Sequence, residues 1–521
     1  MLIWTEIAAR NTVYAAAGGE MEIEMFSYSD FEYKSETDIF RITVPLSEDY
    51  RVYAKGEEIP VYSCRISKYS FNTWWQGHQR SFDQSTHCSY INLVGDEAVT
   101  LKIEARKPHS RVMLKPYSKN VATTEENGMI TVELKENGQF VLELDDHMGL
   151  LYIFYSKPIT CPDTKSVTHY FGPGVHFPKQ IDLKSGDRVY IDKDAMVYGC
   201  LLAHDAENIE IFGNGIIDDS GEARFFSGGY DDYIVGNMRF FDCKNLRIRG
   251  VGMSNSAAWC LSFFNCFDVS VENVKIFGQW RYNTDGIDIC NCQNIFIKDS
   301  FVHSFDDSVT IKGVLQYQNT SNKNIHVEGC TLWCDWGKTC EIGIETACIE
   351  YENISFVNCD LLRAGGIACD ISNGYTAYVH NVRFEDIRVE YNSFDAPEQL
   401  QESDEMVYSR QGEVAIPALF VVHNNKFDNS CGTNYETHSG NAISDKTAWV
   451  TDVVCKDVTI FYDEGVPLTN GKPTISVTLC NSRPDARFEN ITVENVVCNG
   501  KRLEKEDVIF YLSGQSEYDF K

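Results

Sequence analysis

The sequence predicts an all-β protein in which a parallel β-helix (solenoid) follows an N-terminal β-sandwich domain. From about residue 207 onward a short motif recurs: Asn or Asp, an aliphatic residue, any residue, and another residue that favours strands. The first 155 residues lack this motif and alternate apolar with polar residues, as antiparallel strands do. We therefore expect two domains, residues 1–155 and residues 156–521.

The N-terminal alternation is clearest in four runs separated by turn residues. The runs are Phe40–Val44, Val99–Glu104, Ile130–Leu134 and Phe140–Leu144. A β-sandwich of about 150 residues is the simplest structure that such runs can build. Pro158 and Pro162 interrupt the pattern, so we expect the domain boundary near residues 155–163.

The recurring motif places short strands at a drifting period. Its copies start at Asn208, Asn245, Asp268, Asn294, Asn324, Asn353, Asn381, Asp457 and Asn490. From Asn245 to Asn381 successive copies lie 23 to 30 residues apart, without helical patterns between them. Such a period is typical of a solenoid with several short strands in each turn of chain, which indicates a parallel β-helix. We expect the recurring Asn side chains to stack as a structural ladder.

Residues 392–450 break the rhythm of the solenoid. This stretch is polar and acidic, with Gln399, Glu402, Glu405 and many Asn, Ser and Gly residues. We expect a long loop or excursion over one face of the solenoid. Such an excursion either shapes a binding cleft or is inert.

Charge and hydropathy exclude several classes of partner. The formal net charge is −30, from 46 basic and 76 acidic residues, which argues against nucleic acid and anionic membrane surfaces. No run of 18 apolar residues is present, so we expect no membrane-spanning helix. The N-terminus lacks the basic and apolar regions of a signal peptide. We expect a cytoplasmic protein, although a chain from which a secretion signal had been removed would look the same.

The nineteen cysteines are expected to be reduced, because no secretion signal precedes them. Several of them, such as Cys243 and Cys359, lie beside apolar strand residues. Cys290 and Cys292 lack the paired C-x-x-C spacing of a structural zinc site. We expect buried core thiols and no bound metal.

Two segments place carboxylates at the start of strand-like stretches. Asn283–Ile289 contains Asp285, and Asp306–Ile311 begins with Asp306 and Asp307. Each segment continues with apolar residues at alternate positions. Aligning those residues on adjacent rungs offsets the segments by 22 residues and places Asp285 opposite Asp307. The three carboxylates would then lie within roughly 5–10 Å of one another. Crowded like charges do not help folding, so the cluster indicates function.

Clustered aspartates suit the hydrolysis of a glycosidic bond. The reaction needs a proton donor for the leaving oxygen, and an inverting enzyme also needs a base that activates water on the opposite face of the sugar. Like charges raise the proton affinity of one carboxyl group, so that it can remain an acid. A calcium site and ordinary aspartates at strand ends are the alternatives.

The same residues resemble a known family. Asn283-Thr284-Asp285-Gly286 followed by Asp306-Asp307 is similar to the signature of glycoside hydrolase family 28, the polygalacturonase family. Gly213–Asp218 resembles the family's G-x-G-x-I-D turn, and Tyr170–Gly174 resembles bacterial members that carry an N-terminal β-domain. The family shares a clan of right-handed parallel β-helix enzymes with the dextranases and isopullulanases of family 49. The resemblance implies that fold and an inverting glycoside hydrolase without metal or organic cofactor.

Roles follow from the resemblance by position. It implies that Asp306 is the general acid and that Asp285 and Asp307 activate the attacking water. The segment that resembles G-H-G-x-S-I-G is Gly337–Gly343, in which Lys338 stands where histidine is expected. The segment nearest to R-I-K ends at Asp370 and contains neither basic residue.

Those basic residues meet the sugar carboxylate in polygalacturonases, so their absence favours a neutral sugar over galacturonan. The expected substrate-binding residues are Asp288, Trp336, Lys338, Glu341, Glu345, Asp370 and Tyr375. Packing is the alternative for the two aromatic residues, and solvent exposure for Asp288. A structural ion pair with Glu341 or Asp370 is the alternative for Lys338.

Two rival functions stay open. The first is a β-helix polysaccharide lyase that uses calcium, with Lys338 or Lys312 as the base. The second is a carbohydrate-binding β-helix without catalysis. All three hypotheses imply an oligosaccharide or polysaccharide partner, and an oligomer is possible under each of them.

Overall fold

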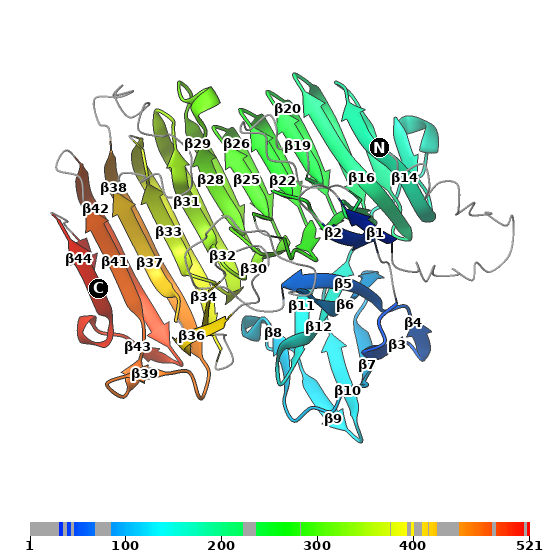
Figure 1. Ribbon diagram of the computed structural model, residues 1–521, viewed down its shortest axis with the longest axis horizontal. Coiled ribbons are helices and arrows are strands. Elements are labelled where there is room, and N and C mark those ends of the chain that lie inside the picture. Colours follow the sequence, from blue (N-terminus) through cyan, green and yellow to red (C-terminus); the bar gives the residue numbers. More distant parts are fainter. Residues whose placement is uncertain are drawn as a thin grey trace, which may run out of the picture.

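Strands make up almost all of the regular structure in the computed structural model. It describes residues 31–34, 39–42, 46–67, 85–221, 236–281, 283–375, 377–392, 397–400, 409–414, 416–424, 448–481, 486–514 and 518–521. Figure 1 shows a long solenoid with a smaller β domain packed against its side. None of the helices among the described residues is long and apolar enough to span a membrane.

The smaller domain contains two five-stranded sheets. The first consists of β3 (Tyr50–Ala54), β4 (Glu57–Ile59), β7 (Val99–Ala105), β9 (Thr123–Glu126) and β10 (Met129–Leu134). The second consists of β5 (Tyr62–Ser67), β6 (Ser85–Val94), β8 (Val112–Lys115), β11 (Gly138–Leu144) and β12 (Asp146–Ser156). Apolar residues from both sheets, such as Ile103 and Ile153, form one buried cluster, as in a sandwich. One pairing differs from the antiparallel prediction, because β12 runs parallel to β6.

The solenoid joins 29 of the described strands in one sheet, so the predicted parallel β-helix is confirmed. Its strands stack rung upon rung in three columns. The first column holds β19 (Met238–Phe241), β22 (Leu261–Phe264), β25 (Ile287–Cys290), β28 (Val309–Gly313), β31 (Lys338–Thr346), β33 (Ile367–Asn373), β37 (Ala418–Asn424), β41 (Ser476–Asn481) and β44 (Ile509–Ser513). The second holds β17 (Glu207–Gly213), β20 (Lys244–Arg249), β23 (Phe267–Glu272), β26 (Gln293–Lys298), β29 (Asn322–Glu328), β32 (Glu350–Arg363), β34 (Tyr378–Tyr391), β38 (Trp449–Tyr462) and β42 (Arg487–Cys498). The third holds β18 (Ile216–Asp218), β21 (Gly252–Ser254), β24 (Lys275–Phe277), β27 (Phe301–Ser304) and β30 (Thr331–Cys334), and it merges into β32.

The recurring Asn residues form the predicted ladder at the start of the second column. Asn324 donates a side-chain hydrogen bond to Asn294 (3.0 Å), and Asn353 donates one to Asn324 (2.9 Å). All three residues have φ between 55° and 60°. Asn tolerates this left-handed conformation better than most residues, which explains why the motif starts with Asn or Asp.

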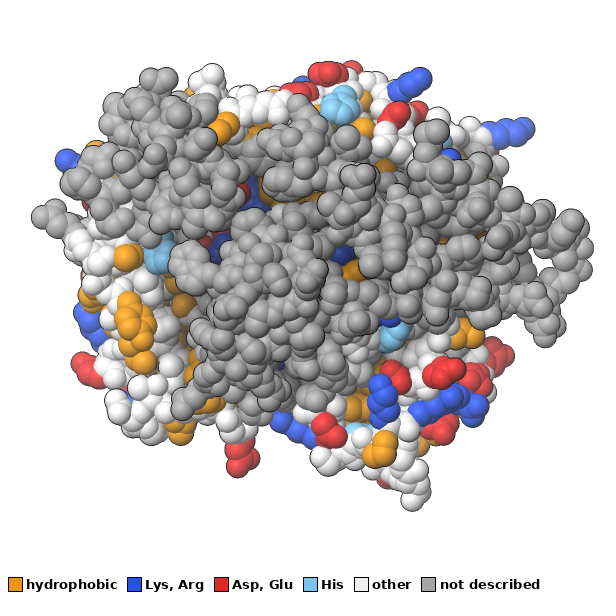
Figure 2. Space-filling model, viewed as in Figure 1, with side chains coloured by type: hydrophobic (Ala, Val, Ile, Leu, Met, Phe, Trp, Pro, Cys, Tyr) orange, Lys and Arg blue, Asp and Glu red, His pale blue; other side chains and the backbone are white. Residues whose placement is uncertain are grey.

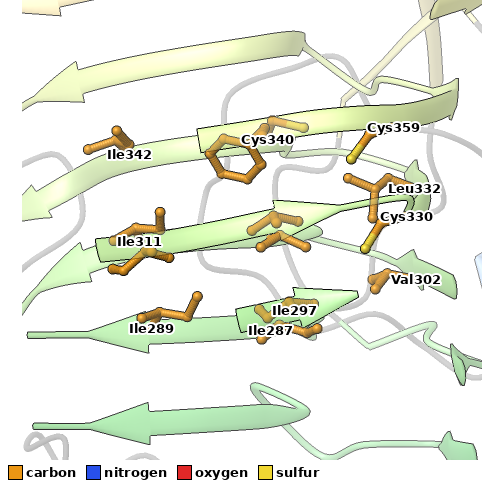
Figure 3. Packing of buried hydrophobic residues seen from close by; sticks show 14 of the residues in the cluster. Ile287, Ile289, Ile297, Val302, Ile311, Cys330, Leu332, Cys340, Ile342 and Cys359 are labelled. Carbon is orange, nitrogen blue, oxygen red and sulfur yellow. The ribbon is translucent and has the colours of Figure 1, made fainter. Parts of the chain in front are cut away.

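The solenoid core is a stack of matching side chains. Ile289, Ile311 and Ile342 lie above one another on β25, β28 and β31 (Figure 3). Cys330 and Cys359 stack in the same way at another corner (Figure 3). Among the described cysteines none forms a disulfide and all but Cys161 and Cys480 are buried, which agrees with the expected core thiols.

The sandwich packs against the third column of the solenoid. Tyr90, Tyr152 and Phe154 from the sandwich share a buried apolar cluster with Phe277 on β24 and Trp333 on β30. The rings of Tyr90 and Phe277 have centroids 4.9 Å apart. The interface therefore combines this apolar cluster with buried polar pairs such as Lys115 and Glu390, which favours a fixed arrangement of the two domains.

The predicted excursion over residues 392–450 is interrupted. Strands β35 (Pro397–Leu400) and β36 (Ser409–Val414) form a separate antiparallel pair. The chain then returns as β37, which pairs with both β33 and β41 inside the solenoid. The prediction of one continuous excursion was therefore wrong, because the apolar run Leu419–Val422 supplies another rung of the solenoid.

Candidate active site

The predicted register between the two aspartate segments is confirmed. Ile287 pairs with Val309 and Ile289 with Ile311, an offset of 22 residues. The Gly286 N–H donates to the Asp307 carbonyl oxygen at 2.8 Å, so the same register continues into the turns that precede the strands. The carboxylate segments are thus neighbours on adjacent rungs.

Alternation along β25 sends two sets of side chains to opposite faces. Ile287 and Ile289 point into the core, so Asp288 points to the outer face. The residues at its position on neighbouring rungs are all polar and buried: Arg239, Ser262, Asp288, Thr310, Glu341 and Asp370. This column, which we call the polar column, forms the floor of the candidate site. In Figure 2, basic and acidic side chains lie together in recesses of the molecule.

A buried lysine connects the carboxylates. Lys312 Nζ lies 2.7 Å from Asp285 Oδ2, 3.1 Å from Asp288 Oδ1 and 3.8 Å from Asp307 Oδ2. Burial opposes the charge of Lys312, but the surrounding carboxylates, Asp285 first, outweigh it and raise the lysine pKa well above its usual range. Lys312 therefore stays protonated and offsets part of the crowded negative charge.

The electrostatic surroundings separate the two adjacent aspartates. Burial, with the charges of Asp285 and Asp307, raises the pKa of Asp306 well above its usual range. Burial also opposes ionisation of Asp307, but the charges of Lys338 and Lys312 outweigh it and lower the pKa of Asp307. Asp306 is thus the carboxyl group that keeps its proton, and Asp307 the one that is ionised.

The pKa of Asp285 is intermediate between those of Asp306 and Asp307. Burial raises its pKa to about 6, against the opposing effect of the Lys312 ammonium. The lysine that contacts Asp307 thus also limits the proton affinity of Asp285. A group with this pKa changes charge within the pH range in which many enzymes work.

A second lysine lies on the other side of Asp307. The Lys338 N–H donates to Asp307 Oδ1 at 3.0 Å, and Lys338 Nζ lies 3.6 Å from the same oxygen. Nζ also lies 2.8 Å from Glu341 Oε1, so the ion pair with Glu341 is present. Lys338 is held protonated, because Asp307 and Glu341 outweigh the effect of burial and raise its pKa.

Position 337 requires glycine because neighbouring side-chain atoms lie very close to it, and not because of its backbone conformation. A Cβ atom at this position would lie 2.3 Å from Asp307 Oδ1 and 2.6 Å from Asp306 Oδ1. Any larger residue would push into both carboxylates. The glycine therefore lets the turn between β30 and β31 close over the aspartate pair.

The other expected substrate-binding residues surround this centre at different depths. Asp288 and Glu341 are fully buried, and burial raises the pKa of both carboxyl groups well above the usual range. Asp370 is also buried; burial raises its pKa to about 6, and its Oδ2 accepts a hydrogen bond from Ser372. Glu345 is half-buried, and its charge raises the pKa of Lys312.

The two aromatic residues lie in turns beside the site. Trp336 directly precedes Gly337, and its ring stacks on Phe305 with centroids 6.1 Å apart. Tyr375 follows β33, and its N–H donates to Thr346 Oγ1 at 2.9 Å. Trp336 therefore has a packing partner and Tyr375 is buried, and their contact with a sugar stays a prediction.

Lys312 is more central to the site than the sequence indicated, where it was only a possible lyase base. The alternation of side chains along the strand could have shown its position: Val309 and Ile311 point inward, so Lys312 has to point outward beside Asp288. Trp259 was not expected in the site, because the ring lies in the turn before β22. Lys312 Nζ lies 4.0 Å from the centre of this ring.

Comparison with known proteins agrees with this geometry. Residues 192–482 match the profile of glycosyl hydrolases family 28. The chain is 25% identical over 221 residues to a probable rhamnogalacturonase A of Aspergillus oryzae, covering 40% of this chain and 44% of the relative. It is 27% identical over 206 residues to a probable polygalacturonase of Arabidopsis thaliana, covering 38% and 41%. The matched part thus spans less than half of these relatives.

Dex49A from Penicillium minioluteum has a similar fold. It has a TM-score of 0.56 and 14% identity, and the match covers 92% of this chain and 95% of that protein. Fold and site together define a parallel β-helix protein with a cluster of buried carboxyl groups around a lysine. The chain belongs to family 28 of the glycosyl hydrolases, as the profile match over more than half of its length shows.

Proposed function

We propose that this protein hydrolyses a glycosidic bond in a neutral oligosaccharide or polysaccharide, with inversion at the anomeric carbon. The observation that carries the proposal is the opposite electrostatic bias of two adjacent carboxyl groups. Asp306 has a raised pKa and Asp307 a lowered one. An acid and a base are thus available side by side at one pH.

The proposed steps assign one role to each aspartate. Asp306 donates its proton to the glycosidic oxygen, and the bond from that oxygen to the anomeric carbon breaks. A water molecule attacks the same carbon from the opposite face, and its proton passes to Asp307 or Asp285. Lys312, which contacts both of these aspartates, holds them in place and favours their ionised forms.

The charges around the site support the proposal of a neutral substrate. Lys312 and Lys338 are both paired with carboxylates, so neither ammonium is available to a uronic acid. Glu341 and Asp370 add further acidic groups on the polar column. Among the described residues, Lys312 and Lys338 are already paired, so a sugar carboxylate would meet these acidic groups unfavourably, whereas sugar hydroxyl groups can donate hydrogen bonds to them.

A lyase is less well supported. Its base has to be neutral when it removes a proton, yet carboxylates raise the pKa of Lys312 and of Lys338 well above the usual range. Both lysines are therefore protonated and cannot act as that base.

The proposal is tested by screening neutral and acidic glycans for newly released reducing ends. We expect release from a neutral glycan, and NMR of the first-formed anomer should show inversion. Activity on polygalacturonate should be weak and should rise with ionic strength, because salt screens repulsion between like charges. Sugar binding without any product would favour a non-catalytic protein, and strong activity on polygalacturonate at low salt would contradict the neutral substrate.

A further inference from the structure

Three buried groups form a hydrogen-bonded chain from the sandwich into the solenoid. Tyr152 on β12 places its Oη 2.5 Å from His303 Nδ1 on β27. His303 Nε2 lies 3.2 Å from Asp335 Oδ2, directly after β30. All three side chains are almost completely buried. Buried polar groups are costly unless they are paired, and here the three groups are paired with one another.

Each group in this chain has a defined partner. Burial opposes ionisation of Asp335, but His303 and Arg363 outweigh it and lower the pKa of Asp335. The carboxylate accepts from Trp333 Nε1 at 3.0 Å and from His303 Nε2–H. Burial raises the pKa of Tyr152 well above its usual range, so its hydroxyl stays protonated and shares a hydrogen bond with His303 Nδ1.

The chain ends at the turn that covers the aspartate pair. The Asp335 N–H donates to the Ser304 carbonyl oxygen at 3.1 Å, and the Trp336 N–H donates to Phe305 at 2.8 Å. Two residues further, Gly337 closes over Asp306 and Asp307, and the Lys338 N–H donates to Asp307. A shift of Asp335 would therefore be transmitted through only three residues to the carboxylates.

We propose that Tyr152, His303 and Asp335 act as positioning residues, through which the N-terminal sandwich fixes the turn at residues 335–338 against Asp306 and Asp307. This inference rests on the proposed function, since it assumes that these two aspartates do the chemistry. The sandwich is then part of the catalytic unit, although Tyr152 need not touch the substrate.

Apolar packing alone is the competing explanation, and it makes a different prediction. The Tyr152 ring also contacts Phe154 and Phe301, with centroids 5.8 and 5.5 Å away. Tyr152→Phe keeps these contacts and removes only the hydroxyl group. Tyr90→Phe is the matched control, because Tyr90 is buried in the same apolar cluster and lies outside the hydrogen-bonded chain.

The test compares kcat, KM and the pH profile of the full-length variants. Losing one buried hydrogen bond is expected to lower kcat of Tyr152→Phe about five- to ten-fold. KM should stay within about two-fold, since no direct substrate contact is lost. The acidic limb of the profile should move to higher pH, because a displaced Lys338 N–H no longer favours ionised Asp307. This limb also reflects Asp285, Asp306, Lys312, Glu341 and Asp370, which all surround Asp307 and are unchanged in the variant.

Wild-type values of kcat and pH profile in Tyr152→Phe, with Tyr90→Phe behaving alike, would overturn the inference. Asp335→Asn is the second variant, since it keeps the shape of the side chain and weakens its acceptor strength.

A carboxyl titration by carbon-13 NMR without substrate separates this inference from the proposed function. An inactive wild-type protein would refute the function alone, whereas an unchanged Asp307 pKa in both variants would refute the positioning role.

Discussion

The Lys312 ammonium lies 2.7 Å from the Asp285 carboxylate, and both groups are buried between adjacent rungs of the solenoid. Asp285 comes from the turn before β25, and Lys312 from the end of β28. The same ammonium reaches Asp288 and Asp307. One positive charge thus holds together a cluster of carboxylates that would otherwise repel one another.

Lys312→Met should destabilise the protein strongly. Removing one partner of a buried ion pair leaves uncompensated charge, which typically costs about 3–5 kcal/mol of unfolding free energy. Urea unfolding at pH 7 measures this loss. The loss should shrink at pH 5, because the unpaired carboxylates can then take up protons.

Lys312→Met combined with Asp288→Asn is the matched control. Asp288 is fully buried against Lys312, so neutralising it should recover part of the lost stability. Equal unfolding free energies for Lys312→Met and the wild-type protein would show that this lysine does not stabilise the cluster.

Gly337→Ala should lower activity strongly while the protein stays folded. The new methyl group would lie 2.3 Å from Asp307 Oδ1 and 2.6 Å from Asp306 Oδ1, so the two carboxylates have to move. A misplacement of this size costs on the order of 100-fold in rate. Gly366→Ala is the matched control, since its methyl group would approach neighbouring atoms only to 3.5 Å. Comparable kcat/KM in the two variants would contradict the close fit.

Asp306→Asn should lower kcat by about 10²–10⁴-fold, because the amide cannot protonate the leaving oxygen. Its thermal midpoint should stay near the wild-type value. The variant should lose less activity on a substrate with a very good leaving group, since such a group can depart without being protonated. Asp205→Asn, at an exposed turn position, should be silent. Near-normal turnover of Asp306→Asn on the natural bond would exclude it as the acid.

Stability should fall as the pH rises from about 4 to about 7. Burial raises the pKa of Asp285 and Asp370 to about 6 and that of Glu390 to about 7. In this window the folded state binds more protons than the unfolded state, so the unfolding free energy has a negative slope against pH. These groups stabilise the protein fully when the pH is below the pKa values that they have in the unfolded protein. The stabilisation is lost as the pH rises past the pKa values that they have in the folded protein. Asp307 and Asp335, whose pKa values are lowered, act in the opposite sense only below about pH 4.

Urea titrations at half-unit pH steps would measure the slope, and Asp370→Asn should reduce it. The amide oxygen can still accept the hydrogen bond that Ser372 donates to Asp370, so packing changes little. An unfolding free energy that increases between pH 4.5 and 7 would contradict the assignment of raised pKa values to these buried carboxyl groups.

The sequence predicted the solenoid well because its determinants are local. An Asn or Asp in the left-handed conformation begins each copy of the motif, and inward apolar residues follow at alternate positions, as Asn294 and Ile295 illustrate. The return of the chain at β37 was not predictable in this way. Leu419–Val422 follows a long polar stretch, and strands of the first column do not begin with the Asn signal.

The candidate site was predictable only where it depends on register. The offset of 22 residues brings Asp285 and Asp307 together, and alternation places Asp288 and Asp370 in one outward column. The contact between Tyr152 and His303 depends on how two domains pack, and no local pattern encodes that. Protonation states are equally non-local, because the lowered pKa of Asp307 requires two lysines on different rungs.

The pairing of β33 with β37 has a consequence for how such a protein can evolve. Asp370 faces Val421 across one hydrogen-bonded step of the sheet, although the chain between them is much longer than in the preceding rungs. The spacing of rungs depends on backbone hydrogen bonds and not on the length of the connecting loop. Connecting loops can therefore be lengthened, shortened or exchanged while the polar column keeps its geometry. Under the proposed function, new sugar preferences can arise in this scaffold without a change of the residues that do the chemistry.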